Sequence, residues 1–161
     1  MGKPTKIVVG YDGSEGARQA LSRAAGLCGY GSLLTVVSVA RSKNELEKAR
    51  RLLLEASDQL LLLHTFARLE ERVGEPVDEL IAAAQENDAD LIVVGNGKTR
   101  IERALHGSVS GSLIHRAPCD VLVARETPVH VAEPRSLAIG DIGPAAQPPP
   151  SNRPLSRAAD S

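Results

Sequence analysis

The feature that most constrains the fold is the run Leu91-Ile92-Val93-Val94, which ends at Gly95. Four consecutive apolar residues, three of them β-branched, predict a strand that is buried on both faces. Further glycines follow at positions 97 and 107, and Gly107-Ser108 leads into a short helical pattern. Glycine lets the main chain approach a ligand closely, and the free N–H groups at a helix start attract anions. The stretch therefore suggests a phosphate site.

The spacing of these glycines excludes two familiar phosphate-binding loops. Gly97-Lys98-Thr99 is similar to the end of a P-loop, but that motif needs a glycine at position 92, which is Ile92. The dinucleotide fingerprint needs a glycine at position 100, which is Arg100. The pattern that remains is Gly95, one residue, Gly97, nine residues, and then Gly107-Ser108.

Apolar stretches and helical patterns alternate along the rest of the folded part. Asp12 or Ser14 is placed to cap a first helix, and Ser42 and Glu45 have capping-box spacing for a second. Pro76 is suited to open a third helix. The stretch 65–73 mixes polar and apolar residues, as an edge strand does. We expect strands at residues 6–11, 33–39, 65–73, 90–94 and 121–124, with helices between them, the last over 109–116.

This alternation, with nearly all-apolar strands, predicts a single α/β domain: a doubly wound, five-stranded parallel sheet with helices on both faces. Right-handed crossovers favour the strand order 3-2-1-4-5. In that order the chain reverses direction between the first and fourth strands. Ligands of open α/β sheets bind at such a switch point, beyond the C-terminal ends of the strands. The loops there begin at Gly10 and Gly95, so the topology and the glycine loop indicate the same place.

Composition and charge limit the other possibilities. A net charge of -1 leaves no basic surface of the kind that binds nucleic acid. The 2 cysteines are too few for a disulfide framework, which favours a cytoplasmic protein. The leucine run at 60–63 is too short to span a bilayer, and the N-terminus lacks the apolar core of a signal peptide. Beyond residue 125 prolines are frequent and no periodicity persists, so we expect a folded domain over 4–125 and a Pro-rich disordered tail over 126–161.

Several segments together carry a resemblance to a known family. They are Lys6–Ser14, Val73–Pro76, Asp90–Gly95, Gly107–Ser110 and Ala117–Val123. Each is a weak signal alone, but in this order and at these distances they are similar to the universal stress protein family, over residues 4–125. The family's loop usually has two residues between its first two glycines, where this chain has only Asn96.

The resemblance implies a Rossmann-like fold of the adenine nucleotide alpha hydrolase type, in a cytoplasmic, usually dimeric protein of the stress response. Some members bind ATP or related adenine nucleotides and others bind none, and the glycine loop marks the binders. The expected ligand is therefore ATP, AMP or cyclic AMP, with or without Mg²⁺. Family dimers commonly form through the last strand, here Val121–Ala124, and an exposed apolar edge strand needs a cover of that kind. We expect no nucleic-acid or membrane partner.

The residues of the glycine loop are candidate phosphate contacts. The glycines at 95, 97 and 107 would let the main chain wrap the phosphates, or would serve as ordinary turn residues. Ser108 and Ser110 would donate hydrogen bonds to phosphate, with the Val109 N–H between them, although Ser108 is also placed to cap the last helix. Lys98 would neutralise phosphate charge, unless it is simply solvated.

The other candidates follow the first two strands. Gly10 and Tyr11 would line the pocket through their backbone. Because a carboxylate repels phosphate, Asp12 would hold ribose hydroxyls, adenine or a shared Mg²⁺, or else cap a helix. The family resemblance assigns an adenine contact to Val39. The full candidate set is Gly10, Tyr11, Asp12, Val39, Gly95, Gly97, Lys98, Gly107, Ser108, Val109 and Ser110.

Nothing in the sequence places a catalytic base or a metal centre. The histidines have no partners at metal-ligand spacing, and the serines form no Gly-x-Ser-x-Gly elbow. We therefore expect a nucleotide-dependent binding protein and not a dedicated enzyme, with slow ATP hydrolysis or autophosphorylation on Ser108 or Ser110 left open. Two alternatives remain: a non-binding dimeric interaction scaffold, and an ATP-pyrophosphatase-type enzyme, for which the chain lacks a serine-glycine-rich loop after its first strand.

Overall fold

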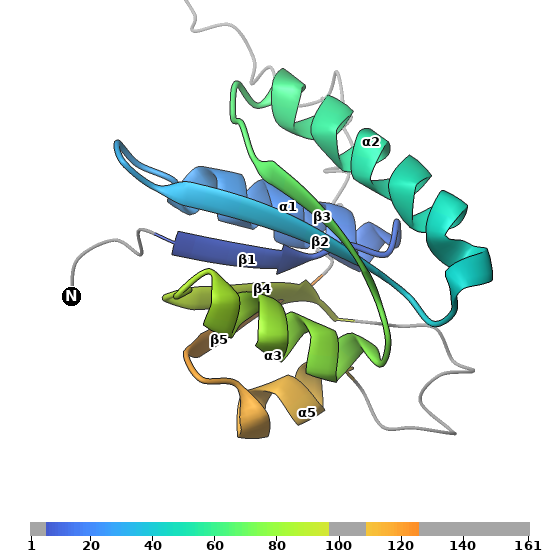
Figure 1. The fold of residues 1–161 in the computed structure, drawn as a ribbon. Helices are drawn as coiled ribbons and strands as arrows, with labels where there is room; N and C mark the ends of the chain where they lie inside the picture. Colours follow the sequence, from blue (N-terminus) through green and yellow to red (C-terminus); the bar gives the residue numbers. More distant parts are fainter. Residues whose placement is uncertain (1–5, 97–108, 126–161) are drawn as a thin grey trace, which may run out of the picture. The chain divides into compact units, whose positions relative to one another are not determined.

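The computed structural model describes residues 6–96 and 109–125, which form a parallel sheet covered by helices (Figure 1). The five strands lie in the order β3-β2-β1-β4-β5, and every neighbouring pair is parallel, so the predicted fold class is confirmed. The elements are β1 (Lys6–Gly10), α1 (Glu15–Leu27), β2 (Leu33–Ala40), the 3₁₀ turn η1 (Lys43–Glu45), α2 (Leu46–Leu62), β3 (Arg68–Val73), α3 (Pro76–Glu86), β4 (Leu91–Gly95), α5 (Val109–Arg116) and β5 (Asp120–Ala124).

Helices cover both faces of the central strands, which explains their unbroken apolar sequences. Ile7 and Val9 of β1 belong to a buried cluster with side chains of α1 and α2, whereas Val8 between them packs with α3. The same alternation runs through β4, whose residues Leu91–Val94 are all buried. Successive side chains of a strand point to opposite faces, so a strand between two helical layers needs an apolar residue at every position.

The start of α1 has a cap predicted from the sequence, whereas the start of α2 lacks the predicted capping box. Ser14 is the N-cap of α1, and its Oγ accepts a hydrogen bond from the Ala17 N–H at 3.1 Å. The predicted capping box at Ser42 and Glu45 is wrong, because those residues border and end a 3₁₀ turn and α2 begins only at Leu46. The Ser42 side chain caps nothing, and the Glu45 carboxylate instead accepts the Arg41 N–H at 3.0 Å.

The edge strand β3 begins at Arg68, later than the predicted residue 65. The preceding residues finish the end of α2: the Thr65 N–H donates to the Leu60 carbonyl at 3.0 Å, and His64 adopts a positive φ of 52°. A chain that is still closing a helix cannot yet join the sheet, so the strand is shortened at its start. Its position at the edge is confirmed.

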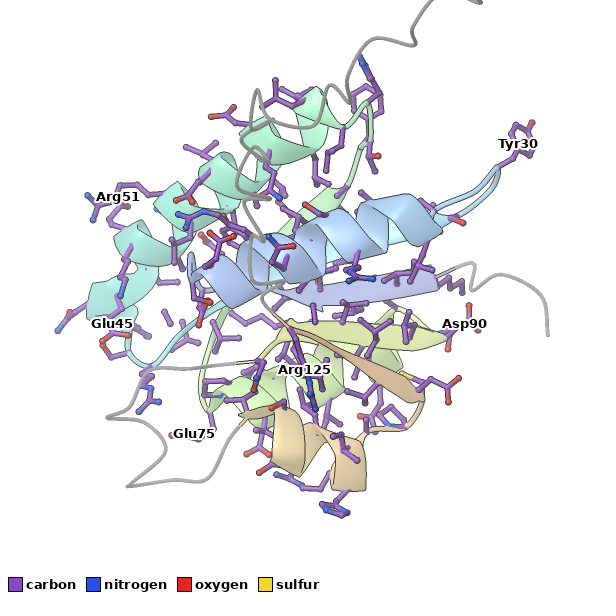
Figure 2. The ribbon with its side chains drawn as sticks, turned by 180° about the vertical axis from the view of Figure 1, so that it is seen from behind. Tyr30, Glu45, Arg51, Glu75, Asp90 and Arg125 are labelled. Carbon is purple, nitrogen blue, oxygen red and sulfur yellow. The ribbon has the colours of Figure 1, made fainter. Side chains whose placement is uncertain are left out.

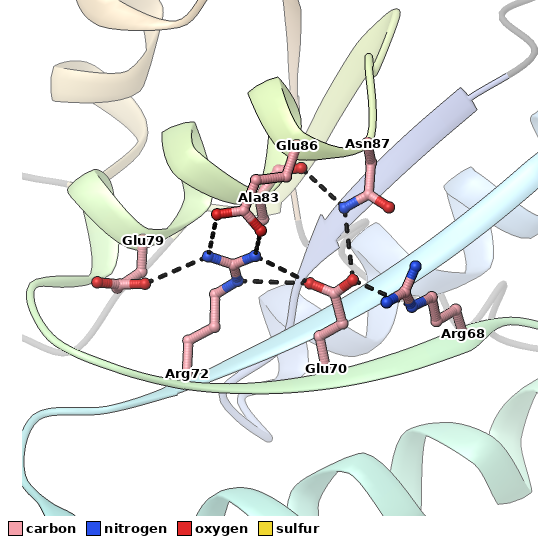
Figure 3. A network of polar contacts seen from close by, with 7 residues as sticks. All are labelled: Arg68, Glu70, Arg72, Glu79, Ala83, Glu86 and Asn87. Atoms are coloured by element: carbon pink, nitrogen blue, oxygen red, sulfur yellow. Dashed lines mark hydrogen bonds and ion pairs between the residues drawn. The ribbon is translucent and has the colours of Figure 1, made fainter.

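A cluster of charged side chains joins β3 to α3 (Figure 3). Arg72 pairs with Glu70 at 3.2 Å, with Glu79 at 3.5 Å and with Glu86, and its own side chain is only 15% exposed. The Asn87 amide donates to Glu70 at 3.4 Å and to the Ala83 carbonyl at 2.8 Å. The carboxylates raise the pKa of Arg72, so its guanidinium stays positively charged beside them.

Candidate functional site

The C-terminal ends of β1 and β4 open onto a cavity of about 490 Å³. It lies at the switch point of the sheet, as the topology predicts. Figure 2 shows Glu45 and Glu75 at this end of the sheet, with Tyr30 and Asp90 at the opposite end. The predicted site residues that line the cavity are Gly10, Tyr11, Asp12, Val39, Gly95, Val109 and Ser110. The other candidates, Gly97, Lys98, Gly107 and Ser108, lie outside the described residues.

Pairing in the sheet brings these loops together. Beyond the register pair Gly10 and Val37, the Tyr11 N–H donates to the Val37 carbonyl at 2.9 Å, so β1 stays beside β2 up to its last residue. On the other side, the Asn96 N–H donates to the Ala124 carbonyl at 2.8 Å and extends the pairing of β4 with β5. The ends of β1 and β4 therefore leave the sheet at the same level, with the cavity between them.

Asp12 stands in the loop after β1 with its side chain exposed at the cavity. Its Oδ1 accepts the Ser14 N–H at 2.9 Å, so Asp12 makes the turn before α1 while Ser14 caps the helix. Gly13 between them has φ of 77°, a left-handed conformation in which glycine is strongly favoured. The turn therefore presents the Asp12 carboxylate to the cavity without using it as a helix cap.

The start of α5 forms the far side of the cavity. Val109 and Ser110 both line it, and Ser110 is 8% exposed. These are the first residues of α5, and the dipole of a helix is positive at its N-terminal end. This side of the cavity is thus suited to a negatively charged group.

Two further segments line the cavity that were not among the candidates predicted from the sequence. The segment after β2 contributes Arg41, Glu45 and Lys48, and the start of α3 contributes Pro76 and Val77. They could have been anticipated from topology, because both segments follow C-terminal strand ends at the same edge of the sheet.

The described part of the chain shows neither a metal cluster nor a membrane segment. No group of three or more His, Cys, Asp or Glu side chains within residues 6–96 and 109–125 is placed to hold a metal ion. Within the same ranges, no helix combines the length and the apolar character that crossing a membrane requires.

Comparison with known proteins identifies the family. The sequence model of the universal stress protein family matches residues 4–125. This chain belongs to the universal stress protein family. The resemblance inferred from its motifs is thereby confirmed.

Individual universal stress proteins support the assignment. The chain is 35% identical over 140 residues to universal stress protein Rv1636 of Mycobacterium tuberculosis strain H37Rv, covering 75% of this chain and 96% of that one. The crystal structure of Rv1636 aligns with a TM-score of 0.54, covering 79% of this chain and 99% of that one at 35% identity. A crystal structure of a universal stress protein in complex with cAMP aligns with a TM-score of 0.64 at 31% identity, covering 78% of this chain and 100% of that one.

Proposed function

We propose that this universal stress protein binds an adenine nucleotide in the cavity between the loops that follow β1 and β4. The observation that carries the proposal is the position of that cavity, at the switch point and lined by the loop after β1, by the end of β4 and by the start of α5. Its volume of about 490 Å³ lies within the usual range for small-molecule sites. The relative in complex with cAMP, 31% identical over nearly all of its own length, supports the same class of ligand.

The lining suggests how the parts of a nucleotide would be divided among the walls. The phosphate would lie at Val109 and Ser110, where the helix start favours an anion. The ribose hydroxyls would donate to the Asp12 carboxylate, because that group accepts hydrogen bonds and repels phosphate. The base would pack on the apolar surfaces of Val39 and Val77.

In this proposal the protein acts in the stress response of the cytoplasm as a nucleotide-dependent binding protein and not as a dedicated enzyme. The described lining of the cavity includes no histidine or cysteine, and the carboxylates of Asp12 and Glu45 there accept main-chain N–H groups of their own turns. Dimerisation would use β5, which is an outer strand of the sheet. ATP, AMP and cyclic AMP all remain candidate ligands, with or without Mg²⁺.

The first experiment is the ultraviolet spectrum of the purified protein, followed by identification of any nucleotide released on denaturation. With no Trp and 2 Tyr, the protein absorbs weakly, so a bound adenine would be plain in the spectrum. Calorimetric titrations with ATP, AMP and cyclic AMP, each with and without Mg²⁺, would then rank the ligands.

Asp12→Ala and the matched control Asp58→Ala complete the test. Asp58 is an exposed residue of α2 that does not line the cavity, so its loss should leave nucleotide affinity unchanged. We expect Asp12→Ala to weaken binding about tenfold, since it removes a charged hydrogen-bond acceptor. A bare protein that binds none of the nucleotides would overturn the proposal and favour the scaffold alternative.

A further inference from the structure

Tyr11, the residue that follows β1, connects the cavity to helix α2. Tyr11 is among the residues that line the cavity, yet it is only 3% exposed and belongs to the buried cluster under α1 and α2. Beyond that cluster, the Tyr11 hydroxyl donates a hydrogen bond to Oε1 of Glu55 at 2.9 Å. One residue therefore reaches from the cavity wall, through the core, to helix α2.

The same carboxylate oxygen also accepts hydrogen bonds from a side chain of helix α1. Arg18 donates to Glu55 Oε1 from Nε at 3.1 Å and from Nη2 at 2.6 Å. One turn along α2, the Gln59 amide donates to the Arg18 carbonyl and to the Ser22 hydroxyl, both at 2.9 Å. Glu55 is thus the meeting point of the loop after β1, α1 and α2.

The position of Asp12 depends on this meeting point. Among the described residues, the Asp12 carboxylate is hydrogen-bonded only to the Ser14 N–H, which is two residues away and moves with the same turn. Asp12 is therefore placed by its neighbours: Tyr11 on one side and the start of α1 on the other. Tyr11 is anchored by its hydroxyl to Glu55 and α1 is anchored by Arg18 to the same atom.

We infer that Tyr11 and Glu55 are positioning residues of the nucleotide site, which hold Asp12 where it meets the ligand. The inference rests on the proposed function. It goes further by assigning a role in binding to the Tyr11 hydroxyl and to Glu55, which does not line the cavity.

The test is a thermodynamic cycle between Tyr11→Phe and Asp12→Ala, measured as AMP affinity by calorimetry. Removing the hydroxyl should weaken AMP binding about fivefold in the wild-type background, the effect of losing one hydrogen bond. In the Asp12→Ala background it should change the affinity by less than about twofold, since the group it positions is already absent. Equal losses in the two backgrounds would overturn the inference and leave Tyr11 a purely structural residue.

Two substitutions at the exposed Glu55 repeat the test without altering the core. Glu55→Leu removes the acceptor and should reproduce the loss of Tyr11→Phe, whereas Glu55→Gln keeps an oxygen for the hydroxyl and should retain most of the affinity. Tyr30→Phe is the control, because Tyr30 is fully exposed and lies at the opposite end of the sheet. If the wild-type protein binds none of AMP, ATP and cyclic AMP, the proposed function fails with the inference. If it binds only ATP or cyclic AMP, the cycle is measured with that nucleotide, and variants that match the wild-type protein overturn the inference alone.

Discussion

The main chain of Gly95, at the end of β4, lies directly against the main chain of Gly16, in the first turn of α1. A Cβ at position 95 would lie 2.3 Å from the carbonyl carbon of Gly16 and 2.6 Å from the Ala17 amide nitrogen. Those are backbone atoms that no side-chain rotation can move. Gly95 therefore determines how closely α1 approaches the sheet beside the cavity, a role distinct from the phosphate contact predicted for it.

Gly95→Ala should consequently destabilise the fold. The added methyl group must push α1 away from β4, and overpacking of this kind costs about 3 kcal/mol. Urea unfolding followed by circular dichroism measures the change. Gly26→Ala is the matched control, because a Cβ there meets nothing within 4 Å and the helix should gain about 0.5–1 kcal/mol. Similar stabilities for the two variants would contradict the packing role.

Ser14→Ala should cost about 1 kcal/mol, because it removes the N-cap hydrogen bond to Ala17. Ser42→Ala should leave the unfolding free energy nearly unchanged, since the Ser42 side chain makes no cap bond. The same urea experiment separates the two serines. A larger loss for Ser42→Ala would mean that a capping box forms there after all.

The cluster around Arg72 should contribute more stability than an exposed ion pair. Arg72→Met leaves Glu70, only 13% exposed, with the exposed Arg68 as its remaining counter-charge, and should cost about 2–3 kcal/mol. Arg50→Met breaks the pairs with Glu47 and Glu71 at a side chain that is 54% exposed, where water screens the charges, and should cost much less than Arg72→Met. Thermal and urea unfolding of both variants measure the difference, and equal losses would show that burial of the cluster is unimportant.

Tyr11 should titrate at unusually high pH. Burial, together with the hydrogen bond to Glu55, raises the pKa of its hydroxyl from 10.0 to about 12. The folded protein then holds this proton more tightly than the unfolded chain, so the contribution to stability is complete below pH 10 and is lost as the pH rises through about 12. In Tyr30→Phe, Tyr11 is the sole remaining tyrosine, and its absorbance reports the titration directly.

Glu55→Gln in that background should lower the midpoint part of the way, because burial remains the larger cause. A midpoint near the ordinary value while circular dichroism still shows a folded protein would contradict the buried, hydrogen-bonded state of Tyr11.

The sequence alone was sufficient for the sheet order and for the meeting of the β1 and β4 loops. Both follow from short-range patterns: apolar runs predict buried parallel strands, and the handedness of their connections leaves one natural order. The Ser14 cap and the α3 start at Pro76 were likewise predictable, because a cap depends on residues within one helical turn. The capping box at Ser42 failed since a 3₁₀ turn displaced the start of α2.

Tertiary structure alone decided which side chains meet across the fold. Tyr11 and Glu55 are 44 positions apart, and Arg72 meets Glu86 from a different element. Such contacts depend on the rotation and closeness of each helix over the sheet, which hydrophobic periodicity specifies only as a face. The contact of Gly16 with Gly95 shows the same dependence. The sequence does not distinguish a glycine required by a turn from one required by close packing of a helix.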